Sequence, residues 1–149
     1  MVKVLFVCLG NICRSPFAEF YFRDLARRRG CSAEFEVASA GTSAEESGNP
    51  VHPGSKALLR EMGIDCSQKR ARQITKRDYA DYDYLVAMDE GNVCSMRRFF
   101  GGDPDGKIVK LLSFCGEERD VADPWYTGDF EATRRDVTEG CEALLTALR

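Results

Sequence analysis

Several features that identify common classes of protein are scarce in this chain of 149 residues. It has a single histidine, His52, and its seven cysteines show neither a Cys-x-x-Cys pair nor the spacing of a metal site. No apolar run approaches the roughly 18 residues that cross a membrane. The run from Val4 to Leu9 is too short for the apolar region of a signal peptide. We therefore expect no metal ion or other cofactor, no membrane span and no secretory leader.

Charge of one sign is not in excess either. The chain carries 21 Lys and Arg against 24 Asp and Glu, which gives a formal net charge of −3. Such a weakly acidic chain is a poor partner for nucleic acid or for an anionic membrane surface. Cysteines without a disulfide or metal pattern are typical of a reducing compartment, so the expected location is the cytoplasm. The length and the balance of 44% hydrophobic and 30% charged residues predict one globular domain over residues 1–149.

The clearest pattern lies near the N-terminus, in the segment VCLGNICRSP. An unbroken apolar run, Val4–Val7, predicts a short buried strand that ends at Cys8. Gly10 and Asn11 follow, and these two residue types most readily accept a positive φ angle. The sequence therefore predicts a tight loop that begins with a thiol at the end of a strand.

A helix is expected to begin where this loop ends. Ser15 is a good N-cap residue and Pro16 is a favoured first helical residue. Free N–H groups of the loop and of the first helical turn would converge there, and Arg14 can donate two hydrogen bonds to one oxyanion. A cysteine in such electropositive surroundings is favoured as the thiolate. We predict a site for a tetrahedral oxyanion facing the Cys8 sulfur, to which the Ser15 hydroxyl can donate.

The same spacing of Cys and Arg occurs a second time, from Cys66 to Arg72 in CSQKRAR. No apolar strand precedes this second match, no glycine lies within it, and Gln73 follows where the first match has a hydroxyl residue. Short motifs often match by chance. We therefore interpret the second match as accidental.

The rest of the chain alternates between strand and helix patterns. Apolar periodicity and turn residues predict further strands over about 34–39, 84–88 and 107–112, and helices over about 15–29, 53–62, 75–82, 89–100 and 129–148. This alternation predicts an α/β fold with an open, twisted, four-stranded parallel sheet, helices on both faces and the oxyanion loop after the first strand. In such a sheet the site lies beyond the carboxyl ends of the strands.

A second candidate segment is Asp123-Pro124-Trp125-Tyr126. Pro124 restricts the backbone directly after the carboxylate. Trp125 and Tyr126 offer flat apolar surface that can hold a phenyl ring. Asp-Pro alone is common in loops, so the weight of this segment comes from its occurrence in a chain that also has the oxyanion loop.

Together, VCLGNICRSP, the segment SAGT that begins at Ser39, YDYLVAMDEGN and DPWY resemble the low-molecular-weight protein tyrosine phosphatase family over nearly the whole chain. The resemblance implies that Cys8 attacks phosphorus, Arg14 binds the phosphoryl group and Asp123 donates a proton to the leaving group. It also implies that the loop binds phosphate through Leu9, Gly10, Asn11, Ile12, Cys13, Arg14 and Ser15, with supporting roles for Ser39, Trp125 and Tyr126.

The activity implied by the resemblance is hydrolysis of phosphotyrosine-type phosphomonoesters through a phosphocysteine intermediate. The partner would be a phosphotyrosine protein or another phosphomonoester, and the product inorganic phosphate. The sequence leaves the physiological substrate open among phosphotyrosine, phosphoarginine, small phosphates and a kinase linked to polysaccharide synthesis. It leaves the oligomeric state open as well.

Four positions depart from the family or leave two interpretations. Glu45 and Glu46 stand where the family often has an aromatic or bulky residue in the wall of the substrate cleft, and an acidic wall disfavours strongly acidic phosphopeptides. Lys69 stands where the family often has a histidine, and it either adds positive charge near the site or points to solvent. Cys13 either protects Cys8 through a reversible disulfide, as the resemblance implies, or is a small buried residue.

Three other functions compete with this interpretation. Arsenate reductases of the same fold share the loop but use two further cysteines after the third strand, where only Cys94 occurs. Phosphocysteine subunits of sugar phosphotransferase systems have a related loop that lacks the arginine. An inactive module that binds phosphorylated residues is a third possibility, against which the presence of Cys8, Arg14 and Asp123 argues.

Overall fold

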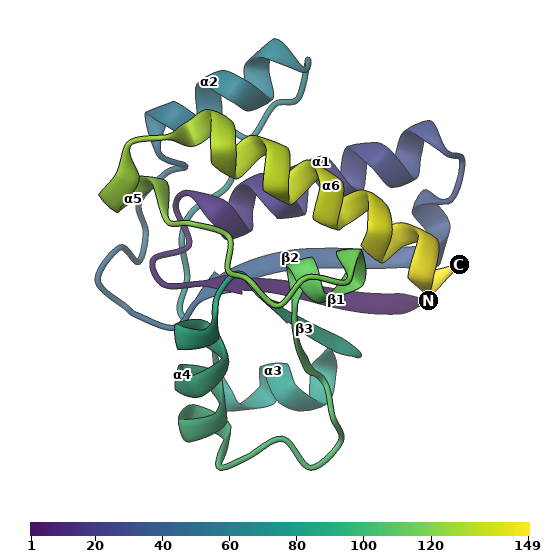
Figure 1. Ribbon diagram of the computed structural model, residues 1–149, viewed down its shortest axis with the longest axis vertical. Coiled ribbons are helices and arrows are strands. Elements are labelled where there is room, and N and C mark those ends of the chain that lie inside the picture. The colour runs from purple at the N-terminus through teal and green to yellow at the C-terminus, as the bar shows by residue number, and fades with distance from the viewer.

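The computed structural model describes residues 1–149. A sheet of four parallel strands crosses its centre in the order β2-β1-β3-β4 (Figure 1). The strands are β1 (Val2–Cys8), β2 (Phe35–Gly41), β3 (Tyr84–Ala87) and β4 (Ile108–Lys110). The predicted α/β fold with an open parallel sheet is confirmed.

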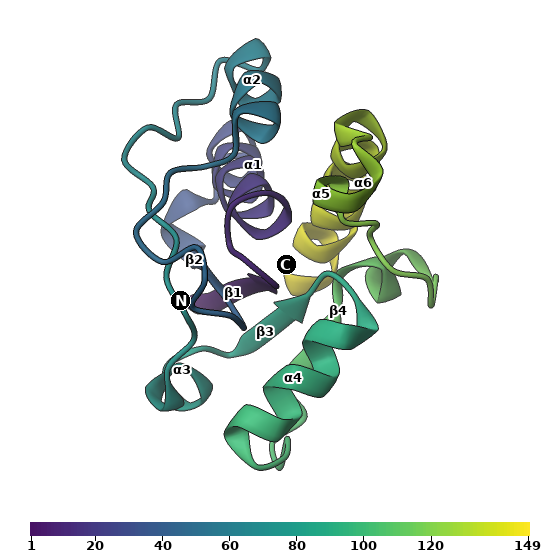
Figure 2. The same ribbon diagram turned by 90° about the vertical axis from the view of Figure 1, so that its left-hand side faces the viewer.

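Helices cover both faces of this sheet (Figures 1 and 2). One face carries α1 (Arg14–Arg28), α2 (Pro53–Glu61) and α6 (Phe130–Leu148), and the other carries α3 (Lys76–Asp81) and α4 (Glu90–Phe100). Two 3₁₀ turns, η1 (Ser32–Glu34) and η2 (Leu111–Cys115), and the short helix α5 (Pro124–Thr127) complete the chain.

Strand β1 shows why its sequence is an unbroken apolar run. Val4 and Phe6 belong to the larger hydrophobic cluster, which α1 and α6 share, while Leu5 and Val7 belong to a second cluster with residues of α4. All four side chains are fully buried. A central parallel strand that packs on both faces needs apolar residues at every position rather than at alternate ones.

The order of the strands fixes where a ligand can bind. From β1 the chain passes through α1 to β2 on one side, and β3 then pairs with the other side of β1. Open α/β sheets bind ligands beyond the carboxyl ends of their strands at such a switch point. Here β1 ends at Cys8, and its partner β3 ends two residues before Asp89.

Two local predictions for the first loop need correction. Helix α1 begins at Arg14 with Cys13 as its N-cap, whereas Ser15 was the predicted cap and Pro16 the predicted first helical residue. Ser15 does not cap the helix because its hydroxyl lies against the Cys8 sulfur instead, at 3.0 Å. Of the two residues expected to favour positive φ, only Asn11 adopts it, with φ 59°.

The fourth strand is shorter than predicted. It ends at Lys110, and the apolar residues Leu111 and Leu112 form the 3₁₀ turn η2. Both are buried, and Leu111 packs so closely on α6 that a Cβ added at Gly140 would lie 2.5 Å from its Cγ. Leu111 and Leu112, which the apolar pattern assigned to the strand, therefore lie in a turn that packs against the last helix.

Candidate active site

The loop from Cys8 to Arg14 forms a cup at the carboxyl end of β1. The Asn11 N–H donates toward Cys8 Sγ at 3.3 Å, so loop and sulfur face each other. Helix α1 starts at the far end of the loop and directs its first N–H groups and its positive dipole end into the cup. The predicted sequence of strand, loop and helix is confirmed, and it brings the thiol, the amides and Arg14 together.

A chain of side-chain hydrogen bonds supports the Cys8 sulfur from behind. Asn11 Nδ2 donates to Ser15 Oγ at 2.8 Å and to Ser39 Oγ at 2.9 Å. Ser39 Oγ in turn donates to Glu19 Oε1 at 2.6 Å. The Glu19 carboxylate can only accept, so the Ser39 hydroxyl donates to it. The Ser15 hydroxyl oxygen accepts from the Asn11 amide, so its own hydrogen is not used in this chain. The Ser15 hydroxyl hydrogen is therefore free to point at Cys8 Sγ, 3.0 Å away.

Lys69 closes this chain and does not point to solvent. Its Nζ donates to the Ser39 carbonyl at 2.9 Å and lies 3.4 Å from Glu19 Oε1. Burial lowers the pKa of Lys69, while the negative charge of Glu19 acts against this. Of the two interpretations left open by the sequence, the structure favours positive charge behind the loop.

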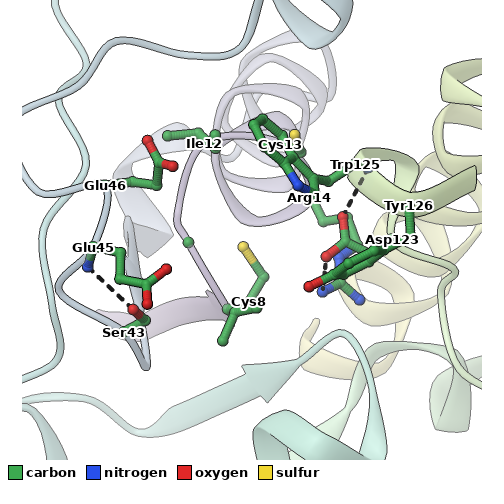
Figure 3. A pocket seen from close by; sticks show the side chains of 12 residues that line it. Cys8, Ile12, Cys13, Arg14, Ser43, Glu45, Glu46, Asp123, Trp125 and Tyr126 are labelled. Atoms are coloured by element: carbon green, nitrogen blue, oxygen red, sulfur yellow. Dashed lines mark hydrogen bonds and ion pairs between the residues drawn. The ribbon is translucent and has the colours of Figure 1, made fainter. Parts of the chain in front are cut away.

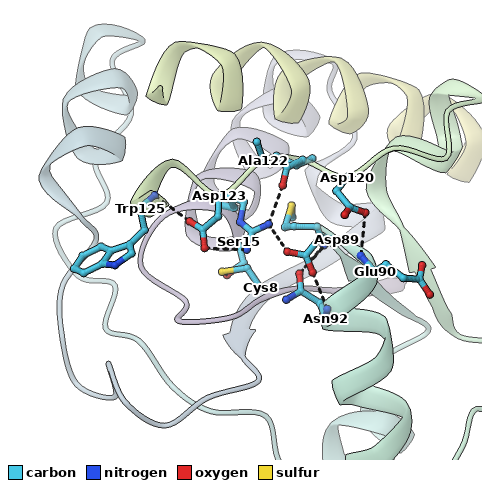
Figure 4. A network of polar contacts seen from close by, with 12 residues as sticks. Cys8, Ser15, Asp89, Glu90, Asn92, Asp120, Ala122, Asp123 and Trp125 are labelled. Carbon is cyan, nitrogen blue, oxygen red and sulfur yellow. Dashed lines mark hydrogen bonds and ion pairs between the residues drawn. The ribbon is translucent and has the colours of Figure 1, made fainter. Parts of the chain in front are cut away.

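Arg14 has two carboxylate partners, Asp89 and Asp123, which Figure 4 labels. Its Nη1 donates to Asp89 Oδ2 and to the Val121 carbonyl, both at 2.8 Å, and its Nη2 donates to Asp123 Oδ2 at 3.3 Å. The side chain is only 2% exposed. Burial opposes the charge, but Cys8 and the two carboxylates outweigh it and raise the pKa of Arg14, so the guanidinium stays charged.

One donor of this guanidinium is unused. Nε of Arg14 is buried without a hydrogen-bond partner, although Arg14 lines the pocket over the loop. A buried donor without an acceptor costs about 1–3 kcal/mol. An oxyanion that accepts from this N–H would remove the cost, so the cup is prepared for an anion.

The second predicted segment lies across the pocket from the loop. Asp123 is the N-cap of α5: its Oδ1 accepts from the Trp125 N–H at 3.1 Å while its Oδ2 faces Arg14. Trp125 and Tyr126 are 58% and 76% exposed at the rim. The structure thus brings Cys8 and Asp123, which are 115 residues apart in sequence, to one pocket (Figure 3).

Not every predicted phosphate-binding residue lines this pocket. Its floor and near side come from Cys8 and from Leu9, Gly10, Ile12, Cys13 and Arg14 of the loop. The buried side chains of Asn11 and Ser15 lie behind the sulfur, where they form the supporting hydrogen bonds described above. Ser39 belongs to the same supporting layer.

Cys13 lines the same pocket as Cys8, and its thiol is the weakly acidic type expected of a buried cysteine. Burial, followed by the negative charges of Cys8 and Asp123, raises the pKa of Cys13 to about 12. At neutral pH this thiol is therefore uncharged. Both cysteines are free thiols in the structure.

An aromatic group ties the loop to the segment of Asp123. The backbone N–H of His52 donates to the Ile12 carbonyl at 2.8 Å. The ring Nδ1 of His52 accepts from the Gly54 N–H and so caps α2. The ring stacks on Phe130 with centroids 5.0 Å apart and meets Trp125 edge-on at 5.8 Å. The lone histidine is thus a helix-start residue, and it also contacts Trp125 in the wall of the pocket.

Sequence reasoning missed two residues of this site. Asp89 stands at the start of a predicted helix, which it caps, but its second oxygen also binds Arg14. Glu19, which orients the hydroxyl chain through Ser39, looked like an ordinary helix residue. No local signal separates either carboxylate from a surface residue, although the position of Asp89 directly after a buried strand was a usable hint.

Two further observations concern metal ions and membranes. No group of three or more His, Cys, Asp or Glu side chains is arranged to hold a metal ion. None of the helices combines the length and the apolar character that crossing a membrane requires. Arg14, the loop amides and the start of α1 are the groups that can bind an anion.

Comparison with known proteins agrees with this geometry. The family model described as low molecular weight phosphotyrosine protein phosphatase matches residues 3–149. The low molecular weight protein-tyrosine-phosphatase YfkJ of Bacillus subtilis is 43% identical over 151 residues, which cover all of this chain and 97% of YfkJ. The crystal structure of YfkJ has a TM-score of 0.96 and covers 99% of this chain and 94% of its own.

More distant relatives share the same length and fold. The human low molecular weight phosphotyrosine protein phosphatase is 40% identical over 148 residues, covering 96% of this chain and 93% of its own. The crystal structure of a Drosophila arginine phosphatase is 31% identical with a TM-score of 0.88, and the match covers 99% of this chain and 98% of its own. The match of the family model and the high identity over full length lead to one conclusion: this chain belongs to the low molecular weight phosphotyrosine protein phosphatase family.

Proposed function

We propose that this protein hydrolyses phosphotyrosine in proteins through a phosphocysteine intermediate, with Cys8 as nucleophile, Arg14 as phosphoryl-binding residue and Asp123 as general acid and base. The observation that carries the proposal is the meeting of these three residues. Arg14 lies within 3.3 Å of Asp123 and shares with Cys8 a cup of amides at the start of α1. A thiolate, a forked cation and a carboxylic acid in one pocket match the needs of phosphoryl transfer to sulfur.

In the first step the Cys8 thiolate forms a bond to phosphorus while the bond from phosphorus to the phenolic oxygen breaks. The Nε–H and one Nη–H of Arg14, together with loop amides, bind the phosphoryl oxygens and stabilise the charge that spreads over them. Asp123 in its protonated form gives its proton to the leaving oxygen. A positioned acid of this kind contributes about 10²–10⁴-fold.

In the second step the Asp123 carboxylate takes a proton from water as that water attacks phosphorus. The bond from phosphorus to sulfur breaks, inorganic phosphate leaves and Cys8 returns to the thiolate. The Ser15 hydroxyl, whose direction is set by Asn11, donates to the sulfur and stabilises it as a leaving group.

Two alternatives to phosphotyrosine hydrolysis are arsenate reduction and phosphoarginine hydrolysis. An arsenate reductase needs further cysteines near Cys8, but Cys94 lies exposed on α4 and does not line the pocket. Phosphoarginine is a more serious competitor, because the Drosophila arginine phosphatase has the same fold. Trp125 and Tyr126 at the rim favour an aromatic substrate group, since flat rings pack well on one another.

The decisive experiment combines turnover with trapping. The wild type should hydrolyse p-nitrophenyl phosphate and phosphotyrosine peptides faster than phosphoarginine peptides. Asp123→Asn should turn over slowly and accumulate protein whose mass is raised by one phosphoryl group on the Cys8 peptide. Full activity of Cys8→Ser, or a clear preference for phosphoarginine, would contradict the proposal.

A further inference from the structure

The wall of the pocket opposite Asp123 is acidic. Glu45 and Glu46 line the pocket together with Ser43, and Figure 3 shows them across Cys8 from Asp123. Their hydrogen-bonding partners are uncharged: Glu46 Oε2 accepts from Asn49 Nδ2 at 2.6 Å. Neither carboxylate pairs with a cation of the protein. Two unneutralised negative charges therefore border a pocket that is prepared for an anion.

The acidic wall is fixed to the phosphate loop. The Ser43 N–H donates to the Leu9 carbonyl at 3.0 Å, and the Glu45 N–H donates to Ser43 Oγ at 3.1 Å. Glu46 also lies close to the loop, since a Cβ added at Gly10 would be 3.4 Å from its Cγ. The negative charges thus have a defined place beside the bound phosphoryl group and do not belong to a freely moving loop.

The floor and the wall make opposite demands on a ligand. The buried Nε–H of Arg14, which has no partner, calls for an anion on the floor. The two carboxylates of the wall repel that anion unless positive charge accompanies it. A ligand with a phosphate at its tip and a cation beside it satisfies both, whereas a ligand with acidic groups beside the phosphate adds to the repulsion.

We propose that Glu45 and Glu46 select phosphotyrosine segments in which Lys or Arg flanks the phosphotyrosine. This inference rests on the proposed function, because it assigns a sequence preference to the same pocket. The phosphotyrosine ring enters between the acidic wall and Trp125, and a neighbouring basic side chain then reaches the carboxylates. Exposed charge pairs contribute modestly, so the expected preference is about threefold for each charge and about tenfold for two.

The test compares two phosphotyrosine peptides that differ only beside the phosphotyrosine, with Lys on both sides in one and Glu on both sides in the other. For the wild type we expect kcat/KM about tenfold higher for the Lys peptide. In the double variant Glu45→Gln/Glu46→Gln this ratio should fall to within about twofold of unity. The pair Glu61→Gln/Glu139→Gln is a matched control, because it removes the same charge from exposed residues outside the pocket.

A second measurement does not depend on variants. In 1 M salt, where the screening length is about 3 Å, the preference of the wild type should shrink strongly. Equal kcat/KM for the two peptides, or a preference that survives both high salt and the double variant, would overturn the inference while p-nitrophenyl phosphate is still hydrolysed. Absence of p-nitrophenyl phosphate hydrolysis would instead remove the proposed function, and this inference with it.

Discussion

The chain contains the spacing Cys-x5-Arg twice, and only the first copy brings its cysteine and its arginine to one pocket. Cys8 and Arg14 meet at a pocket, whereas Cys66 is buried in the main hydrophobic cluster and Arg72 forms two hydrogen bonds to the carboxylate of Asp78. The first copy joins the end of a strand to the start of a helix, and the second lies in irregular chain between α2 and α3. The comparison teaches that spacing alone does not make an anion site.

In the second copy no secondary structure directs the thiol and the guanidinium toward each other. No strand end presents Cys66, and no helix begins at Arg72 to supply free N–H groups. Burial raises the pKa of Cys66, whose surroundings are those of a core residue. Arg72 nevertheless contributes to the first copy, since its backbone N–H donates to Asn11 Oδ1 at 3.0 Å. The accidental motif thus supports the loop through its backbone.

The largest expected difference between the two copies concerns the cysteines. Cys8→Ser should lower kcat for p-nitrophenyl phosphate by more than about 10³-fold, because an uncharged hydroxyl replaces the nucleophilic thiolate. Cys66→Ala should leave kcat within about twofold and lower the free energy of unfolding by roughly 1 kcal/mol through the lost core volume. Steady-state kinetics and urea unfolding of both variants measure these effects. Equal losses of activity would show that the thiols do not differ as described.

The arginines should differ next. Arg14→Lys keeps the charge but loses the planar fork, and we expect kcat to fall about 10²–10³-fold. Arg72→Lys loses one of two hydrogen bonds from a partly exposed guanidinium to the buried carboxylate of Asp78, which costs about 0.5–1.5 kcal/mol of stability. Its kcat should remain within about twofold, because the backbone N–H that binds Asn11 is unchanged. A matching loss of activity in Arg72→Lys would contradict the comparison.

A smaller effect tests the aromatic support that only the first copy has. His52→Asn keeps a good helix cap but loses the stack on Phe130 and the contact with Trp125. A lost aromatic contact is worth about 0.5–1.5 kcal/mol, so kcat/KM for phenyl phosphate, which needs the acid, should fall about two- to tenfold. The value for p-nitrophenyl phosphate, with its better leaving group, should change less.

His52→Phe provides the matched control for this prediction. It retains a ring on Phe130 and gives up the side-chain cap, so it should behave more like the wild type than His52→Asn does. The same loss for both substrates in His52→Asn would indicate a general structural defect and not a displaced Asp123.

The last prediction compares Cys13, which lies within the first copy, with the exposed Cys94 outside it. Alkylation follows the thiolate fraction, and burial, the largest cause of the raised pKa of Cys13, persists when the charge of Cys8 is removed. In Cys8→Ser protein we therefore expect exposed Cys94 to react with iodoacetamide before Cys13. Reaction of Cys13 should accelerate as the pH rises toward 11, because deprotonation then increases. Peptide mass spectrometry gives both rates, and rapid labelling of Cys13 at pH 7 would refute the assignment.

The sequence predicted the parts of the site that local pattern controls. The apolar strand, the loop with Asn11 at positive φ and the position of Arg14 follow from neighbouring residues, and the parallel sheet follows from the alternation of elements. Asp123 was also identified, but through resemblance and not through any local force. The structure places it where that prediction requires, while its role stays a prediction.

The parts that could not be predicted depend on contacts between distant segments. Arg14 meets Asp89 across 75 residues, and no periodicity encodes that pairing. Ser15 satisfies every rule for a helix cap, yet the nearby sulfur and Asn11 claim its hydroxyl. The end of β4 was wrong for a similar reason, because the buried face of α6 competes with the sheet for Leu111.

One close contact near the pocket bears on the timing of the reaction. A Cβ at Gly54 would lie 2.5 Å from Phe130, so the first turn of α2 and the start of α6 are wedged together beside α5. Because the segment that flanks Asp123 is held in this way, we expect the Asp123 carboxylate to be in position before substrate binds. We therefore expect the reaction to proceed without closure of a lid, and the rate of the first chemical step to be insensitive to solvent viscosity.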